Sequence, residues 1–123
     1  RREDVVYLGS LPHSDTALLF NALDIGVIYL KDTPFGRYCF PQKAYEMLAC
    51  RLPVVAADVG AMPALFDDPR NLYHVDDEAS LAQAILANLE APAVSDREIR
   101  DWKDVVGDLE YHLRTVRAKA APS

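Results

Sequence analysis

The chain alternates short apolar segments with longer segments in which apolar residues recur every three or four positions. Four apolar segments are expected to be β-strands, at residues 4–8, 24–30, 53–57 and 72–75. The second of these is almost continuously apolar, which is typical of a strand covered on both faces of a parallel sheet. The pattern therefore predicts the α/β class, with a parallel sheet, flanking helices and right-handed crossovers.

The segments between these strands are predicted to be helices or turns. Ser14 or Asp15 is expected to cap a first helix that ends near Leu23, and Asp76 or Asp77 a later helix that ends near Leu89. Residues 31–40 are polar and contain glycine and proline, so we expect a loop there. The apolar face of the first helix is expected to consist of Leu18, Leu19, Ala22 and Leu23.

The last third of the chain has a different pattern. Ser95 and Glu98 have the spacing of a capping box, which predicts a long helix over residues 96–119. We therefore divide the chain into an α/β part, residues 1–90, and a C-terminal helical tail, residues 91–123. One apolar stripe follows the predicted helix through Ile99, Trp102, Val106, Leu109, Leu113 and Val116.

The segment from Phe40 to Ala57 carries the clearest chemical signal. It predicts a helix opened by Pro41 and ending near Cys50, followed by a short turn and a buried strand. Lys43 and Glu46 lie three residues apart and therefore share one face near the start of this helix. A helix N-terminus attracts anions, so a cation and a carboxylate there suit a nucleotide with its phosphates and hydroxyls.

This segment resembles the donor-binding motif in the C-terminal domain of GT-B glycosyltransferases, in particular the bacterial polysaccharide branch. The order of the elements over roughly residues 4–90 is also similar to that family. The resemblance implies a partial Rossmann-like domain that binds the nucleotide-sugar donor. Arg51 stands where the family usually has glycine. The matching residues are Pro41, Lys43, Glu46, Met47, Ala49, Pro53, Val54 and Val55.

The resemblance also implies roles for individual residues. Glu46 would accept hydrogen bonds from the ribose hydroxyls, and Lys43 would neutralise the departing diphosphate, so both are expected to be catalytic. The remaining residues of the donor site are expected to be Gly9, Ser10, Tyr38, Phe40, Pro41 and Gln42. Tyr38 stands where many relatives have a glutamate, which leaves open whether the reaction retains or inverts the anomeric configuration.

The implied activity is transfer of a sugar from a nucleotide-sugar, with uridine diphosphate as the expected nucleotide, to a glycan or lipid-linked acceptor in polysaccharide biosynthesis. We expect neither a cofactor nor a metal. Two alternatives remain: a GT-B-fold sugar-nucleotide epimerase, and a non-catalytic flavodoxin-like interaction module. A receiver-type module is disfavoured, because no acidic cluster follows the first predicted strand.

Composition limits the partners. The chain has 123 residues and a net charge of −6, which argues against nucleic-acid binding because no broad basic face is available. Cys39 and Cys50 lack further ligands at zinc-site spacing, so we expect free thiols. We see neither a signal peptide nor an apolar run of membrane-spanning length. These features predict a cytoplasmic protein, with peripheral contact to the inner membrane open for the intact enzyme.

The resemblance further implies that two βα units and an N-terminal domain are absent from this chain. The acceptor would then bind through the absent domain, and the chain alone is expected to be inactive. Without those units the strands at residues 4–8 and 24–30 would lack neighbours. Because exposed strand edges invite pairing, we expect either self-association or a rearranged sheet. The C-terminal helix packs on its own sheet or crosses back towards the N-terminal domain.

Overall fold

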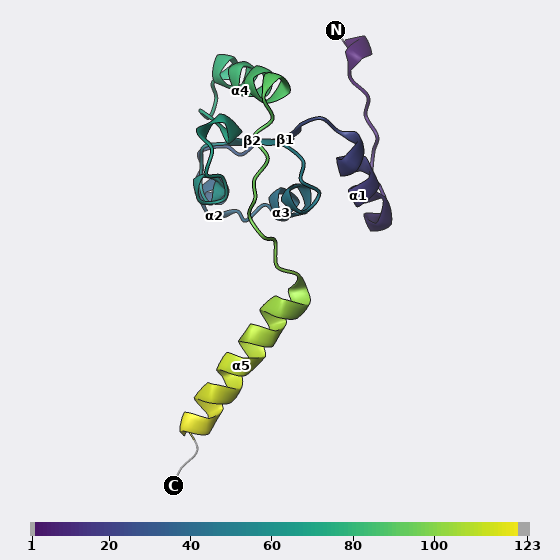
Figure 1. The fold of residues 1–123 in the computed structure, drawn as a ribbon. Coiled ribbons are helices and arrows are strands. Elements are labelled where there is room, and N and C mark those ends of the chain that lie inside the picture. The colour runs from purple at the N-terminus through teal and green to yellow at the C-terminus, as the bar shows by residue number, and fades with distance from the viewer. Residues whose placement is uncertain (1, 121–123) are drawn as a thin grey trace.

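The computed structural model describes residues 2–120. It contains a three-stranded parallel sheet of order β1-β2-β3, formed by β1 (Gly26–Ile28), β2 (Val54–Ala57) and β3 (Leu72–Tyr73). Helices lie on both faces of the sheet, so the α/β, Rossmann-like class is confirmed (Figure 1). The central strand β2 is buried along its whole length, whereas Val27 on the edge strand β1 is 44% exposed.

Two apolar cores cover the two faces of β2, because successive side chains of a strand point to opposite sides. Val54 and Ala56 pack with α3 (Gln42–Ala49), and Val55 and Ala57 pack with α4 (Glu78–Glu90). Figure 1 shows α4 on one side of the sheet and α2 (Pro34–Tyr38) and α3 on the other. This three-layer arrangement is the one that the alternating pattern predicts.

The expected strand at residues 4–8 is wrong. A 3-10 helix (Arg2–Asp4) is followed by coil, and Val5, Val6 and Tyr7 are 75%, 77% and 92% exposed. No strand of the described chain pairs with the outer edge of β1. A strand forms only when its backbone groups find a neighbour. The β-forming sequence therefore stays unpaired beside α1 (His13–Ala22).

The start and the apolar face of α1 also differ from expectation. The N-cap is Pro12, so Ser14 and Asp15 lie inside the helix. The Ser14 hydroxyl donates to Asp15 Oδ1 at 3.0 Å instead of capping the helix. Phe20, rather than the expected leucine face, is the buried side chain of α1, and Leu18 is 71% exposed.

Other boundaries shift by a few residues. The predicted loop at residues 31–40 contains α2, whose N-cap Thr33 accepts a hydrogen bond from the Gly36 amide at 3.2 Å. Pro41 is the N-cap of α3 and not its first helical residue. The capping of α4 by Asp77 is confirmed, with the Ser80 amide donating to Asp77 Oδ1 at 2.9 Å.

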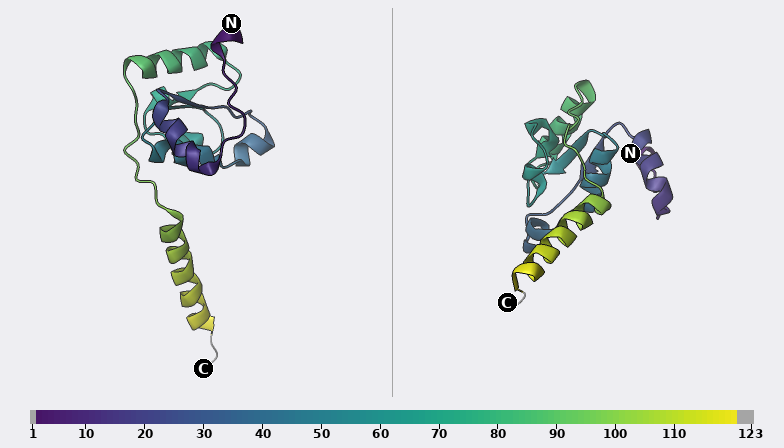
Figure 2. Two further views of the ribbon diagram at one scale, coloured as in Figure 1. Left: turned by 90° about the vertical axis from the view of Figure 1, so that its right-hand side faces the viewer. Right: turned by 60° about the horizontal axis from the view of Figure 1, so that its bottom comes forward.

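The C-terminal helix α5 (Trp102–Ala120) starts later than predicted. Ser95 Oγ accepts from the Arg97 amide, so the expected capping box is wrong, and Asp101 Oδ1 accepts from the Asp104 amide at 2.9 Å instead. Residues 92–101 are not helical, because Ile99 packs against the core on the α3 side. Figures 1 and 2 show α5 extending away from the sheet instead of lying on it.

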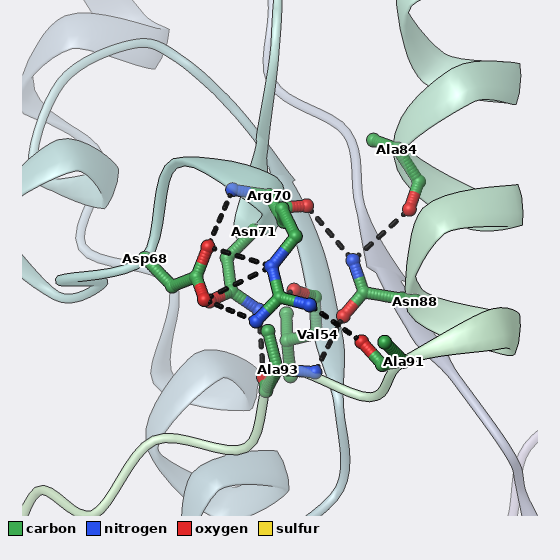
Figure 3. A network of polar contacts seen from close by, with 8 residues as sticks. All are labelled: Val54, Asp68, Arg70, Asn71, Ala84, Asn88, Ala91 and Ala93. Atoms are coloured by element: carbon green, nitrogen blue, oxygen red, sulfur yellow. Dashed lines mark hydrogen bonds and ion pairs between the residues drawn. The ribbon is translucent and has the colours of Figure 1, made fainter.

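A buried polar network fixes the chain where it leaves the sheet (Figure 3). Asn71 is 2% exposed, and its Nδ2 donates to Val54 O at 2.7 Å and Ala93 O at 2.9 Å. Asn88 is 1% exposed; its Nδ2 donates to Arg70 O at 2.8 Å, and its Oδ1 accepts from the Ala93 amide at 3.0 Å. The two amides thereby tie β2, the turn before β3 and the end of α4 together.

Candidate donor-binding site

The orientation of α3 follows from the residue of this helix that lies at the start of β1. A Cβ atom on Gly26, the first residue of β1, would lie 2.7 Å from Met47 Sδ, near the end of α3. The end of α3 therefore lies at the start of β1, and its N-terminus points towards the carboxyl ends of the strands. In open α/β sheets, ligands bind at these carboxyl ends.

The loops at the carboxyl ends of the strands, which form the carboxyl edge of the sheet, are packed closely together. Gly60 follows β2 and has φ +62°, and a Cβ atom there would lie 2.7 Å from Gly36 O and 2.9 Å from Arg37 O. Arg37 donates to Asp32 from Nε at 2.6 Å, and this hydrogen bond holds the pKa of the Asp32 carboxyl below its ordinary value. The loop after β2 thus supports α2, which leads directly into α3.

Lys43 and Glu46 lie on α3 as their spacing predicts. Ala44, Met47 and Leu48 are buried against the sheet and fix the helix, whereas Lys43 is exposed and Glu46 is half-buried. Within residues 2–120, neither the Lys43 nor the Glu46 side chain has a hydrogen bond or ion pair to another residue. An unpaired cation and an unpaired carboxylate therefore stand together near a helix N-terminus, which adds its own partial positive charge.

The aromatic residues before α3 are arranged around its first turn. Phe40 stacks on Tyr45, with ring centroids 4.8 Å apart and an interplanar angle of 26°. One face of the Phe40 ring is covered by Tyr45, and Phe40 remains 62% exposed. Tyr38, at the end of α2, is 90% exposed. The structure thus brings five of the expected donor-site residues to one region: Phe40, Pro41, Gln42, Lys43 and Glu46.

Gly9 and Ser10 are not brought into this group. Both lie exposed in the coil before α1, and nothing lies within 4 Å of a Cβ atom placed on Gly9. Figure 1 shows this coil and α1 to one side of the sheet, beyond β1. Gly9 has φ +70°, a conformation that glycine adopts without strain, but the expected strand before it does not form.

Sequence reasoning missed an acidic hollow of about 220 Å³ at the same edge, on the α4 side. The Tyr29 hydroxyl donates to Asp76 Oδ1 at 3.2 Å; desolvation and this hydrogen bond raise the pKa of Tyr29. Burial also raises the pKa of Tyr73. The signal in the sequence was the run Asp76–Glu78, which follows a strand and opens a helix. The lining residues are Tyr29, Tyr73, Asp76, Asp77, Glu78 and Leu81.

The two sides of this edge therefore differ in charge. The hollow on the α4 side carries three carboxylates and would repel a diphosphate. The α3 side carries Lys43 and the helix N-terminus. A second hollow, of about 280 Å³, is lined by Leu48, Arg51 and Ile99 among others, beside the end of α3 and so away from the carboxyl ends of the strands. An anionic ligand at the carboxyl edge is best accommodated on the α3 side.

Across residues 2–120, no group of three or more His, Cys, Asp or Glu side chains is placed to hold a metal ion. Among the described helices, none is both long enough and apolar enough to cross a membrane. Cys39 and Cys50 are free thiols, each partly buried.

Comparison with known proteins identifies a family for this chain. The model of the family described as "Glycosyl transferases group 1" matches residues 1–91, which include the sheet, α3 and most of the cores described above. No match was found among curated proteins or among solved structures. The helix α5 lies outside the matched residues.

Proposed function

The chain belongs to the group 1 glycosyl transferases, and on that premise we propose that it binds the nucleotide-sugar donor on the α3 side of the sheet. The observation that carries the proposal is the pair of unpaired side chains, Lys43 and Glu46, near the N-terminus of a helix directed at the carboxyl ends of the strands. Binding there would place the diphosphate at the positive end of α3.

Each residue has a distinct task in this proposal. The Lys43 ammonium and the first-turn amides of α3 neutralise the diphosphate, whose negative charge grows as the bond to the sugar breaks. The Glu46 carboxylate, one turn further along the helix, accepts hydrogen bonds from the ribose hydroxyls. Phe40, Pro41 and Gln42 shape the entrance to the first turn, and Tyr38 offers an exposed ring beside it.

The finer assignments belong to the same proposal. We assign uridine diphosphate as the nucleotide, a glycan or lipid-linked molecule as the acceptor, polysaccharide biosynthesis as the process and the cytoplasm as the location. The acidic hollow on the α4 side supports the choice of the α3 side for the diphosphate, because its carboxylates oppose a second anion. The family match favours sugar transfer over the non-catalytic alternative.

The test uses two ligands and three variants. Titration calorimetry compares the binding of uridine diphosphate with that of uridine for the unchanged chain, Lys43→Ala, Glu46→Ala and the control Lys103→Ala, which removes an exposed lysine of α5 away from the carboxyl ends of the strands. Lys43→Ala should weaken the binding of uridine diphosphate but not that of uridine, because uridine lacks the diphosphate that Lys43 would neutralise. Glu46→Ala should weaken the binding of both ligands by about 1.5–3 kcal/mol, roughly a tenfold to hundredfold loss of affinity, because the carboxylate that accepts hydrogen bonds from the ribose is lost.

Turnover by the enzyme that carries this domain gives the second readout. Lys43→Ala should lower kcat, because it acts on the leaving diphosphate, and Glu46→Ala should lower kcat/KM for the donor. Rates and affinities equal to those of the unchanged protein in one variant would refute the role of that residue. Equal values in both variants would refute the site.

A further inference from the structure

An aromatic ring at the start of α3 is held in place but covered on one face only. Phe40 stacks on Tyr45, with ring centroids 4.8 Å apart and an interplanar angle of 26°, yet Phe40 is 62% exposed. Tyr45, in the first turn of α3, is half-buried and is therefore the inner ring of the pair. The outer face of the Phe40 ring is open to a planar group of a ligand.

Of the two exposed rings expected in the donor site, Phe40 is the one with a fixed position. Tyr38 is 90% exposed, and within residues 2–120 no other ring stacks on it. A ring that is already held in one orientation loses less conformational entropy when a ligand covers it. Phe40 is therefore better suited than Tyr38 to stack on a ligand.

The order of the side chains around α3 indicates which part of the donor reaches the Phe40 ring. Relative to Glu46, Lys43 is rotated around the helix by about 60° to one side and Tyr45 by about 100° to the other, because successive residues differ by about 100°. Glu46 thus lies between the exposed Lys43 and the stacked rings of Phe40 and Tyr45.

The next step rests on the proposed function, which assigns the diphosphate to Lys43 and the ribose to Glu46. A nucleotide carries its phosphates and its base on opposite sides of the ribose. With the ribose at Glu46 and the phosphates on the Lys43 side, the base lies on the other side, where the stacked rings are. The sugar is joined to the outer phosphate and therefore lies away from these rings.

We propose that the outer face of Phe40 stacks on the nucleobase of the donor, while Tyr45 supports the Phe40 ring from the inner side. Stacking uses the flat face that every base has, so this contact contributes affinity without selecting uracil. The subsite at Phe40 therefore accepts nucleosides and nucleotides of more than one base, whereas the Lys43 contact requires phosphate.

The first test compares the binding of five ligands by titration calorimetry: uridine, cytidine, uridine diphosphate, uridine diphosphate glucose and pyrophosphate. Phe40→Leu keeps an apolar side chain but removes the flat ring. It should weaken the four ligands that carry a base by about five- to thirtyfold, in the lower part of the range for base–aromatic stacking because the ring is open to water. The binding of pyrophosphate should not change.

Two variants serve as controls for Phe40→Leu. Phe40→Tyr keeps a ring and should bind all five ligands as the unchanged chain does. Tyr111→Leu removes an exposed ring of α5, away from α3, and should also have no effect. Far-UV circular dichroism should be the same for all variants, because Phe40 and Tyr111 are both exposed.

The second test detects the stacking itself. Trp102 on α5 is the single tryptophan of the chain, so combining Trp102→Phe with Phe40→Trp leaves one tryptophan, at the proposed base subsite. Uridine diphosphate should quench the fluorescence of this tryptophan, because the base covers the indole ring. Pyrophosphate, which has no base, should leave the fluorescence unchanged. Equal fluorescence with and without bound uridine diphosphate would contradict the stacking.

The results distinguish this proposal from the donor site on which it rests. Binding of uridine diphosphate that depends on Lys43 and Glu46 but is unchanged in Phe40→Leu would overturn the stacking role and leave the donor site intact. A loss confined to uridine diphosphate glucose would place the ring against the sugar, and an equal loss for pyrophosphate would make Phe40 a support of α3; either result overturns the proposal. If the unchanged chain bound no uridine diphosphate, both proposals would be refuted.

Discussion

Replacing Asn88 by alanine should destabilise the fold, because this side-chain amide is buried and hydrogen-bonded through both its nitrogen and its oxygen. Its side chain makes three hydrogen bonds: Nδ2 to Arg70 O at 2.8 Å, Nδ2 to Ala84 O at 3.0 Å, and Oδ1 from the Ala93 amide at 3.0 Å. Asn88→Ala leaves Arg70 O and the Ala93 amide without partners in the interior. Each unsatisfied group costs about 1–3 kcal/mol.

The net loss is smaller than the sum of these costs. Alanine is the better helix former by about 0.5 kcal/mol, and water entering the vacated space restores part of the lost bonding. We therefore expect the free energy of unfolding to fall by about 2–4 kcal/mol, a large share of the roughly 5–15 kcal/mol that holds a typical domain together. The exposed Gln83, in the same helix, provides the control.

Urea unfolding followed by circular dichroism measures the loss, and hydrogen exchange localises it. Asn88→Ala should lower the midpoint and remove the protection of the Ala93 amide, which donates to Asn88 Oδ1. Gln83→Ala should change the free energy by no more than about 0.5 kcal/mol. If Asn88→Ala also stayed within that margin, the buried network would contribute nothing to the stability of the fold.

Two further changes test other parts of the structure. Asp68 accepts hydrogen bonds from the Arg70 side chain and backbone, and these bonds lower the pKa of the Asp68 carboxyl from its ordinary value of 3.8. The bonds therefore stabilise the fold fully above pH 3.8. This stabilisation is lost as the pH falls through the lowered pKa that Asp68 has in the folded protein. In acid unfolding, Asp68→Asn should flatten the pH dependence over this range; an unchanged slope would contradict the pairing. Gly60→Ala should lower stability by about 1–3 kcal/mol, because Gly60 has φ +62° and lies against Gly36 O. In thermal melts the control Gly107→Ala, in α5 with open space around it, should be neutral or stabilising, and equal effects of the two glycine changes would refute the close contact.

The α/β class and the position of α3 could be predicted because they follow from local patterns. The buried strand β2 alternates its side chains between the two cores, and Lys43 and Glu46 fall on one helix whatever surrounds it. The cap of α4 at Asp77 likewise depends only on neighbouring residues. These features needed no knowledge of distant contacts.

The errors arose where distant contacts decide the local structure. The sequence of residues 4–8 favours a strand, but no neighbour pairs with it, so Gly9 and Ser10 do not end a strand. Ser95 and Glu98 have capping-box spacing, yet packing of Ile99 on the core keeps this segment non-helical. The contact of Tyr29 with Asp76 joins residues 47 positions apart, so the sequence shows the acidic run Asp76–Glu78 but not the tyrosine that lines the hollow with it.

The central claim is that the diphosphate of the donor binds at the N-terminus of α3. Titration of the ¹⁵N-labelled chain with uridine diphosphate tests it most directly, with amide chemical shifts as the readout. The account predicts the largest shifts at Gln42, Lys43 and Ala44, reduced by Lys43→Ala. Shifts centred instead on residues 76–78 at the start of α4, or no shifts in α3 at ligand concentrations that perturb other residues, would contradict it.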